Sequence, residues 1–541
     1  MAFAAYVRQG DREDFEARYF ARRRKLNALV MAELARGDGR YLDAIADGLW
    51  LICEESGWQL PAHNAQARGG RRAPLPDPAD PVLDLFAAET GGLVAVLLSL
   101  LGERLEEHLP GLRARAEAEI ERRILTPYMT RDYWWMGGVD GPTNNWTVWI
   151  TQNVLLAGLT QPIAADRRAA LVRRAVRSLH AFLSDYGEDG ACEEGAMYYR
   201  HAGLCLWGAL DLLERVMPQQ VEPVWRLPKI RNIADYIEAV HVGGHRYINF
   251  ADCPAVTARC SLREVLFGRA VGSTRLEAFA TRNAGAEGWD DLPDEINLWY
   301  RLLQARHAGA VIGPPPPAPP PRDVWYPSIG LMVARDDRFT LAVKAGDNGD
   351  SHNHNDVGSV TLYKNGQPVL IDLGVETYTA RTFSSRRYEI WTMQSSWHNL
   401  PSFGGVGQAP GDAFAACDVA ASLTEGQARL DMDITAAWPP EAGLRAARRR
   451  VTLHKGVGVE IEDSYDGDLP AELTLLFSAE PRVTGQGLEL PGLADLRLEG
   501  LSDLRISAVP VTDPRLARSW PNGIWRVLCA VPTGQLKVTI N

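Results

Sequence analysis

Apolar residues follow a helical spacing through the first part of the chain. From about residue 12 to about 305 they recur every three or four positions, as they do on one face of a helix. The connections between these stretches are rich in Gly, Pro and Asp. The pattern predicts a helical first half, with its clearest helices at 41–53, 93–101, 146–159, 168–183 and 202–216.

A proline-rich segment at 313–321 ends this pattern. Proline lacks the backbone N–H and fixes φ, so the segment suits neither a helix interior nor a central strand and predicts a stiff, extended connector. We therefore predict a helical domain at 1–312, a linker at 313–323 and a second domain at 324–541.

Beyond the linker, apolar and polar residues alternate between turn signals. Residues 359–372 predict two strands joined by a hairpin turn at Asn365-Gly366. Similar runs at 450–459, 472–478, 503–509 and 525–540 predict an all-β second half, folded as an antiparallel β-sandwich.

Together these patterns predict an α+β multidomain fold: an N-terminal incomplete (α/α) toroid followed by the β-sandwich. Paired helices without a fixed-period repeat favour a toroid over a solenoid. The loops at one end of a toroid form a cleft suited to a long ligand.

Composition and charge narrow the function. The chain has 541 residues, 46% hydrophobic and 23% charged, which is typical of globular domains. Its net charge of −11 argues against nucleic-acid binding. The apolar run at 91–101 is too short to span a bilayer, so no membrane partner is expected. A homo-oligomer is compatible with the sequence.

The expected compartment is reducing. The seven cysteines are scattered without a CxxC pair, which favours reduced, mostly buried thiols. The first residues lack the pattern of a signal peptide, which favours the cytoplasm. A trimmed sequence would be compatible with the periplasm or secretion.

Two histidines, His352 and His354, form the most informative polar motif. On a strand this spacing points both imidazoles to one face, where one can bind a metal and the other stay available for chemistry. Asp356, Asp372 and His398 are possible partners. We favour His354, Asp372 and His398 as ligands, a set that suits zinc, or manganese if more oxygens join.

Other interpretations of the paired histidines exist. They could simply be hydrogen-bonded surface or core residues. The string His352-x-His354-x-Asp356 also resembles the HxHxDH motif of metallo-β-lactamase-like hydrolases. Val357 stands where that motif has its last histidine, and the surrounding sequence predicts strands only.

Two polar segments of the helical half could contribute to a site. In the first, Asn144 and Asn145 precede a helix that begins near Trp146; a helix cap explains one amide but not both. The second opens another helix and groups potential acids and bases: Glu194, Tyr198, Tyr199, Arg200 and His201. A turn with stacked tyrosines would equally explain the second segment.

Trp58 and His63 are further candidates to line a cleft. Tryptophan is a good platform for a sugar ring, although it more often fills a core.

Four ordered motifs of this chain resemble the heparinase II/III family of polysaccharide lyases. They are Asn144-Asn145-Trp146 through Asn153, Asp189-Gly190 through Tyr198-Tyr199, His352-x-His354 with Asp372, and Ser395-Ser-Trp-His398-Asn. The order of a helical toroid and then a β-sandwich extends the resemblance over most of the chain.

The resemblance implies β-elimination at a uronic acid in glycosaminoglycans, alginate or related polymers, so the expected partner is an anionic polysaccharide or oligosaccharide. It assigns carboxylate neutralisation to Asn145, acid/base work to Tyr198, with Tyr199 as the alternative, and the base to His352. One structural divalent metal, zinc or else manganese or calcium, is expected on His354, Asp372 and His398. Contacts to substrate are expected from Asn144, Trp146, Glu194, Arg200, His201, Trp58 and His63.

The sequence departs from the family pattern at two places. Ala196 stands where relatives often have proline, and His201 stands where another residue type is expected. Both departures bear on the choice of substrate.

Two competing functions are weighed against the lyase. One is an (α/α)-barrel glycoside hydrolase that uses Glu193, Glu194 or Asp189 as its carboxylate pair. Neighbouring Glu193 and Glu194 point in different directions on a helix, which weakens that pairing. The other is a metal-stabilised carbohydrate-binding protein without catalysis.

Overall fold

The computed structural model describes residues 2–138, 141–286, 292–311, 317–320 and 322–541. Much of the predicted linker, residues 313–316 and 321, lies outside the described residues. The chain forms two compact units and passes between them more than once. Unit 1 comprises Met1–Tyr186, Arg200–Ala234 and Cys260–Pro317, and unit 2 comprises Gly187–Tyr199, Asp235–Arg259 and Ala318–Asn541.

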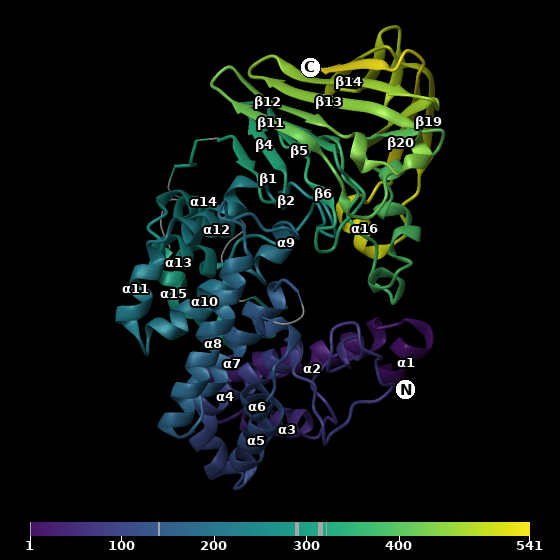
Figure 1. Ribbon diagram of the computed structural model, residues 1–541. Coiled ribbons are helices and arrows are strands. Elements are labelled where there is room, and N and C mark those ends of the chain that lie inside the picture. The colour runs from purple at the N-terminus through teal and green to yellow at the C-terminus, as the bar shows by residue number, and fades with distance from the viewer. Residues whose placement is uncertain (1, 139–140, 287–291, 312–316, 321) are drawn as a thin grey trace. The chain divides into compact units, whose positions relative to one another are not determined.

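Unit 1 is built from helices (Figure 1). They are α1 (Ala2–Gln9), α2 (Glu13–Arg36), α3 (Leu42–Cys53), α4 (Leu85–His108), α5 (Leu112–Ile120), α6 (Thr126–Thr130), α7 (Asn145–Thr160), α8 (Ala165–Asp185), α10 (Gly203–Glu214), α11 (Pro218–Trp225), α13 (Leu262–Ala270), α14 (Thr274–Gly285) and α15 (Leu298–His307). Short turns add η1 (Pro61–His63), η2 (Glu121–Leu125, π-helical), η3 (Trp134–Met136) and η4 (Ala308–Val311), and α12 (Pro228–Ala239) runs from unit 1 into unit 2. The predicted helical first half is confirmed.

Local capping explains where several of these helices begin. The Asp84 carboxylate accepts a hydrogen bond from the Ala87 N–H at the start of α4, and the Asn144 side chain accepts one from the Trp146 N–H at the start of α7. Ser261 and Glu264 form a capping box at the start of α13. These side chains satisfy N–H groups that a helix leaves without partners.

Helix α4 is long and apolar enough to cross a membrane by length and composition alone. In this structure 83% of its apolar window is buried within the protein. Burial of this kind is typical of the core helix of a helical domain.

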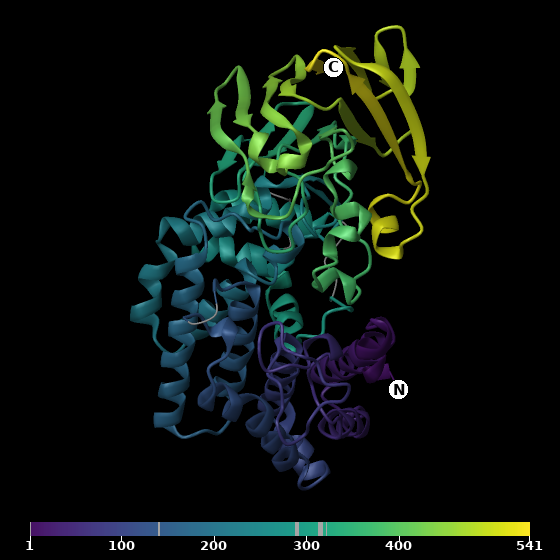
Figure 2. The ribbon, with the colours of Figure 1, turned by 45° about the vertical axis from the view of Figure 1, so that its right-hand side comes forward.

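Unit 2 is built mainly from antiparallel sheets. One has the order β11-β12-β13-β14-β21-β18-β17-β16, a second β19-β20-β15-β9 and a third β3-β4-β5-β7-β8, while β10 pairs with β6 and β1 with β2. Figure 1 shows β11 to β14 side by side, and Figure 2 shows the strands nearest the C-terminus, in yellow, running alongside one another.

The predicted runs at 472–478 and 503–509 each match one strand, whereas the runs at 450–459 and 525–540 each cover parts of two strands. The bounds of all strands in the described residues follow. They are β1 (His241–Gly243), β2 (Arg246–Tyr247), β3 (Val324–Tyr326), β4 (Leu331–Arg335), β5 (Phe339–Lys344), β6 (Asp347–Asn348), β7 (Val360–Lys364), β8 (Gln367–Leu370), β9 (Pro401–Phe403), β10 (Gly411–Ala415), β11 (Cys417–Leu423), β12 (Gln427–Asp433), β13 (Leu444–His454), β14 (Gly458–Gly467), β15 (Ala471–Phe477), β16 (Arg482–Thr484), β17 (Gly487–Leu490), β18 (Ala494–Glu499), β19 (Ser502–Val509), β20 (Ile524–Val531) and β21 (Gln535–Ile540).

The three large sheets share one apolar core, to which Leu341, Leu453 and Val527 each contribute a fully buried side chain. The predicted hairpin between β7 and β8 is confirmed. Its two turn residues, Asn365 and Gly366, have φ values of 51° and 75°, the positive values that a tight hairpin turn requires.

The prediction of an all-β second half is wrong in detail. Helix α16 (Pro514–Ser519) begins there because the Asp513 carboxylate caps its first turn. Short 3-10 turns also occur, namely η5 (Arg381–Phe383), η6 (Arg387–Glu389), η7 (Trp391–Met393), η8 (Ser395–Trp397), η9 (Thr435–Ala437) and η10 (Pro440–Ala442). The mixed composition, with sheets in the C-terminal part, is confirmed, whereas the toroid and the sandwich stay predictions.

Candidate functional site

Tyr198 lies on the short helix α9 (Ala196–Tyr199), which belongs to unit 2. The residue before α9, Gly195, has a φ of 84°, and a Cβ at this position would lie 2.7 Å from the Cβ of Cys253. Only glycine allows this close approach. The packing brings α9 against the loop that carries Asp252.

His352 occupies a strained position opposite this loop. Its φ of 55° lies in the left-handed region, which residues with a Cβ rarely adopt. Its Nδ1 lies 2.7 Å from the Oδ2 of Asp252, and its ring centroid lies 5.2 Å from that of Tyr198. Ala251, the neighbour of Asp252, also has a positive φ, of 51°. Strain of this kind often marks functional sites.

Asp252 is the centre of this cluster, and its side chain is fully buried. Besides His352, it accepts hydrogen bonds from the Nη2 of Arg387 at 2.7 Å and the hydroxyl of Tyr378 at 3.0 Å. The Nε2 of His354 lies 3.1 Å away. Asp252 therefore joins both histidines of the predicted motif.

No sequence motif indicated Asp252, Tyr378 or Arg387 as site residues. The local sequence offers little signal for Asp252, which follows the mixed segment Tyr247–Ala251. Nothing in the spacing relates it to His352, because the two residues lie 100 positions apart.

Two tyrosine hydroxyls meet beside His352. Tyr198 and Tyr378 share a hydrogen bond through their hydroxyl groups. The guanidinium of Arg515 lies 4.2 Å from the ring centroid of Tyr378 and donates a hydrogen bond to the Asp252 carbonyl at 3.1 Å. A phenol, a second phenol, a carboxylate and an imidazole thus form one continuous hydrogen-bonded chain.

The charges around His352 favour its protonated form. Burial lowers the pKa of His352, but the carboxylates of Glu194 and Asp252 more than offset this and raise the pKa above its usual value. Burial raises the pKa of Asp252, yet the hydrogen bonds from His352 and His354 hold it well below the usual range. Asp252 accepts a hydrogen bond from the Nδ1 of His352, so the Nε2 of His352 is the nitrogen left to take a proton.

The acidic groups near His352 and Asp252 hold their protons more strongly than usual. Burial raises the pKa of Tyr198, and the charge of Asp252 adds to the effect. Burial, followed by the nearby Glu194 and Asp350, raises the pKa of Glu193 to about 7. Burial also raises the pKa of Glu194. The site therefore holds a phenol that stays protonated at neutral pH next to an imidazole that can accept a proton.

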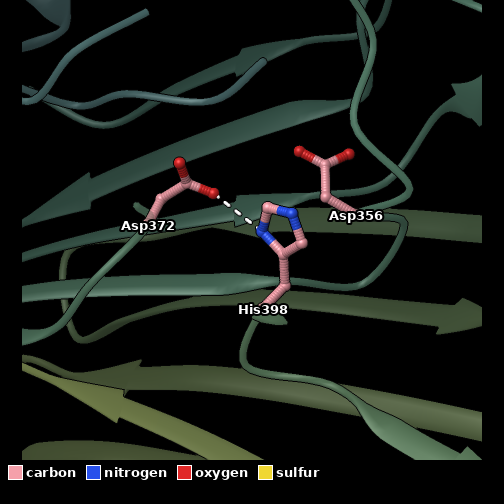
Figure 3. Close-up of side chains that lie close together, drawn as sticks. All are labelled: Asp356, Asp372 and His398. Atoms are coloured by element: carbon pink, nitrogen blue, oxygen red, sulfur yellow. Dashed lines mark hydrogen bonds and ion pairs between the residues drawn. The ribbon is translucent and has the colours of Figure 1, made fainter. Parts of the chain in front are cut away.

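A second buried cluster consists of Asp356, Asp372 and His398. One ligand atom from each of these residues can be chosen so that all three lie within 4.8 Å of one another. The Nδ1 of His398 lies 2.9 Å from the Oδ2 of Asp372. Figure 3 shows the imidazole of His398 between the two carboxylates, with Asp356 on the side away from Asp372.

The buried atoms of this cluster fit a divalent metal. His354 Nδ1, His398 Nε2 and Asp356 Oδ1 are buried without a hydrogen-bond partner, which is costly unless something else satisfies them. The rings of His354 and His398 lie 5.5 Å apart. Imidazole nitrogen and carboxylate oxygen form a donor set that suits zinc or manganese. The metal and its ligands His354, Asp372 and His398 stay a prediction, and the structure adds Asp356 to the candidates.

The first predicted motif of the helical half lies in unit 1. Asn144 is the cap of α7, as the structural interpretation of one asparagine predicts. Asn145 is the first residue of the helix and is mostly buried, while Trp146 is half-buried. The Nδ1 of His63 lies 2.7 Å from the buried carboxylate of Asp84, and the ring of His63 lies 4.7 Å from that of Trp146.

The prediction that Trp58 contacts substrate is wrong. Its side chain is 1% exposed, its indole N–H donates to the Ile52 carbonyl, and the guanidinium of Arg123 lies 4.7 Å from its ring. A side chain held in this way fills the core and presents no face to a ligand.

Arg200 and His201 also belong to unit 1. The Nε of Arg200 lies 4.0 Å from the Oε1 of Glu264. The ring of His201 stacks on that of Trp149, with 3.9 Å between the ring centroids. Burial, followed by the nearby Arg263 and Arg200, lowers the pKa of His201 to about 3. His201 is therefore neutral at ordinary pH and acts as an aromatic surface.

The structure also separates the remaining alternatives. Tyr199 is fully buried and packs near Tyr236, so Tyr198 is the phenol beside His352. The carboxylate of Asp189 binds the backbone and hydroxyl of Ser328, which is a structural task. Because the Nδ1 of His352 faces Asp252, the HxHxD string does not form a single ligand set.

Comparison with known families bears on unit 2. Residues 318–521 match the family model described as Heparinase II/III-like, C-terminal. The resemblance predicted from the sequence motifs is confirmed over this segment, which contains His352, Tyr378 and His398. No curated protein matches the chain.

Solved structures share the fold over most of the chain. A heparan sulfate lyase HepC mutant from Pedobacter heparinus matches with a TM-score of 0.63 and 13% identity, over 96% of this chain and 75% of that one. A heparinase III matches with a TM-score of 0.65 and 14% identity, over 95% of this chain and 75% of that one. A chondroitin AC lyase mutant from Streptomyces coelicolor A3 matches with a TM-score of 0.52 and 15% identity, over 97% and 75%. The family model and these folds come from polysaccharide lyases, which are carbon–oxygen lyases.

Proposed function

We propose that the protein is a glycosaminoglycan lyase that cleaves next to a uronic acid by β-elimination. The observation that carries the proposal is the Asp252 cluster of unit 2. It holds an oriented imidazole, His352, with its ring centroid 5.2 Å from that of a phenol, Tyr198. The match to heparinase II/III-like and chondroitin lyase folds supports the same chemistry.

The reaction divides into two proton transfers. The Nε2 of His352 removes the C5 proton of the uronate, and the electron pair forms the C4–C5 double bond as the C4–O4 bond breaks. Tyr198 donates its hydroxyl proton to the departing O4. The products are a 4,5-unsaturated uronate end and a glycan with a new hydroxyl. Each such transfer typically contributes about 10²- to 10⁴-fold to the rate.

Tyr378 and Asp252 support both groups. Asp252 fixes the tautomer of His352 and stabilises the imidazolium that forms. Tyr378 links the hydroxyl of Tyr198 to Asp252 and can pass a proton to Tyr198 after it has donated its own. Burial raises the pKa of Tyr378 well above its usual range, and the positive charge of Arg515 beside this phenol pair offsets part of the effect.

The uronate carboxylate must also be neutralised. The C5 proton is weakly acidic, so charge that develops on the carboxylate has to meet an aimed donor. We assign this task to the amide of Asn145, which carries no charge of its own. Asn144, Trp146, His63, Glu194, Arg200 and His201 are proposed to contact the glycan.

A divalent metal, with zinc favoured, is proposed on His354, Asp372 and His398, with Asp356 beside them. Bound there, the metal would stabilise the loops of unit 2, because binding to buried ligands contributes directly to folding. The chemistry at the uronate is left to His352 and Tyr198.

The decisive experiment follows ultraviolet absorbance during incubation with heparan sulfate, heparin, chondroitin sulfate, hyaluronan and alginate. Elimination creates a conjugated double bond that absorbs, whereas hydrolysis does not. We expect absorbance with at least one uronate polymer. New reducing ends without absorbance would favour a hydrolase, and binding without cleavage would favour a carbohydrate-binding protein. Neither alternative is favoured by the comparisons, and the Asp189 carboxylate already binds the backbone and hydroxyl of Ser328.

A further inference from the structure

A row of aromatic side chains crosses part of unit 1. Neighbouring rings in the row have centroids 5.2 Å apart for Phe20 and Phe86, 6.0 Å for Phe86 and His63, 4.7 Å for His63 and Trp146, and 5.1 Å for Trp146 and Trp134. The residues come from α2, α4, η1, α7 and η3, elements far apart in the chain. We refer to Phe20, Phe86, His63, Trp146 and Trp134 as the aromatic row.

Each member of the aromatic row is partly exposed, which packing alone does not require. The contrast is clearest at two consecutive residues: Trp135 is 1% exposed and fills the core, whereas Trp134 is only half-buried. Likewise Trp149 is mostly buried, while Trp146 on the same helix is half-buried. Adjacent apolar surface left in contact with solvent commonly marks a binding site.

The aromatic row is held in place from behind. Asp84 is fully buried. Its carboxylate accepts hydrogen bonds from the Ala87 N–H at 2.7 Å and the Leu60 N–H at 3.2 Å, and it lies 2.7 Å from the Nδ1 of His63. One carboxylate thus fixes both the start of α4 and the orientation of the imidazole. Rings that are already oriented lose little conformational freedom when a ligand binds.

Positive charge lies at the Trp134 end of the row. The guanidinium carbon of Arg68 is 5.0 Å from the centroid of Trp134, and Arg68 is exposed. Arg71 and Arg72 follow within the same loop. The face of a pyranose ring carries C–H groups that stack on indole, while a guanidinium binds carboxylate or sulfate through paired hydrogen bonds.

We infer that the aromatic row and Arg68 form a glycan-binding subsite that takes pyranose rings of an anionic glycan outside the cleaved linkage. The inference deepens the proposed lyase function and rests on it for the identity of the ligand. Trp134 and Trp146 stack on sugar rings, and Arg68 binds a carboxylate or sulfate group. Trp134, Phe20, Phe86 and Arg68 are thereby assigned a role that no sequence motif indicated.

Equilibrium binding tests the subsite apart from turnover. Oligosaccharides of heparan sulfate, chondroitin sulfate and hyaluronan are titrated calorimetrically into His352→Ala protein and into the same protein with Trp134→Ala or Trp146→Ala. We expect the dissociation constant to rise about 3- to 10-fold for each tryptophan, the effect of losing one aromatic contact. Trp134→Phe and Trp146→Phe keep a ring and should retain most of the affinity.

Trp50 provides a matched control. It is 46% exposed on α3, and the guanidinium of Arg115 lies 6.0 Å from its ring, yet it is not part of the aromatic row. Trp50→Ala should leave the dissociation constant unchanged. Arg68→Gln should weaken binding of sulfated oligosaccharides more than that of hyaluronan, and added salt should reduce this difference.

The outcomes separate the subsite from the lyase. Glycan binding that depends on both tryptophans, without any ultraviolet product from wild-type protein, would keep the subsite and overturn the lyase. Ultraviolet product with an unchanged dissociation constant in folded Trp134→Ala and Trp146→Ala proteins would overturn the subsite and keep the lyase. Equal losses in Trp50→Ala, or no binding of any of these glycans, would also overturn the subsite.

Discussion

Two of the imidazole–carboxylate pairs in unit 2 are alike in local chemistry and different in exposure to solvent. His352 and His398 each direct Nδ1 at an aspartate, at 2.7 Å to Asp252 and 2.9 Å to Asp372. The His352 side chain is 25% exposed, whereas that of His398 is fully buried. The imidazole of His352 is therefore in contact with solvent, and that of His398 is not.

The neighbours of the two pairs differ in the same sense. Beside His352 lie Tyr198 and Tyr378, which can exchange protons. Beside His398 lies a further carboxylate, Asp356, whose pKa is raised by burial. We therefore propose that the same pair of residue types serves catalysis at His352 and structure at His398, according to what surrounds each pair.

The largest expected effect on turnover comes from removing the imidazole of the more exposed pair, His352 and Asp252. His352→Ala should lower kcat by about 10²- to 10⁴-fold, because the base is lost, without changing the thermal unfolding temperature much. Tyr198→Phe should do the same by removing the acid. The measurement is ultraviolet product formation alongside circular dichroism melting.

Tyr199→Phe is the control for Tyr198→Phe, since it removes a phenol from the adjacent, fully buried position. It should retain turnover. If it loses turnover while Tyr198→Phe keeps it, the assignment of the acid is wrong.

Removing the imidazole of the buried pair, His398, should lower the stability of the protein more than its activity. His398→Ala leaves the Asp372 carboxylate buried without its partner, which typically costs about 3–5 kcal/mol of unfolding free energy. We also expect wild-type protein to contain one equivalent of divalent metal by elemental analysis and the variant to contain none. A chelator should lower the melting temperature of wild-type protein and leave that of the variant unchanged; equal responses would argue against the metal.

Asp252→Asn tests how the carboxylates tune the accessible imidazole. Burial lowers the pKa of His352, but Glu194 and Asp252 raise it above its usual value, and the base works only when unprotonated. Turnover should therefore rise as pH increases through this raised pKa. Removing the Asp252 charge should move the acidic limb of kcat/KM to lower pH. A limb that stays in place, or moves to higher pH, would show that Asp252 does not act on His352.

A pH-dependent effect on stability concerns a buried carboxylate without an imidazole partner, Glu89 in unit 1. Burial, followed by the charge of Glu295, raises the pKa of Glu89 to about 8. The folded state holds this proton more tightly than the unfolded chain, so folding stability should fall as pH rises from the unfolded pKa towards 8. The slope should be at most about 1.4 kcal/mol per pH unit.

Glu89→Gln should remove this part of the pH dependence. Urea unfolding of both proteins between pH 5 and 8 measures the difference, which should grow with pH in favour of the variant. A constant difference over that range would contradict the raised pKa.

The local patterns of the sequence predicted much of this protein. Apolar spacing located the helices, Asn144 indicated the start of α7, and Asn365-Gly366 indicated the hairpin between β7 and β8. These features depend on residues within a few positions of one another. The paired histidines also marked a segment that the fold packs against Asp252, because their spacing is itself local.

Tertiary structure decided the partners. Asp252 approaches His352 from 100 positions away, and Tyr378 approaches Tyr198 from 180. Trp58 and Trp134 belong to the same residue type, yet one lies in the core and the other on the surface. Hydrogen-bond partners, burial and pKa values arise from the packing of segments that are distant in sequence, and local periodicity carries no information about them. The sequence by itself determined which elements form, and the fold determined which side chains meet.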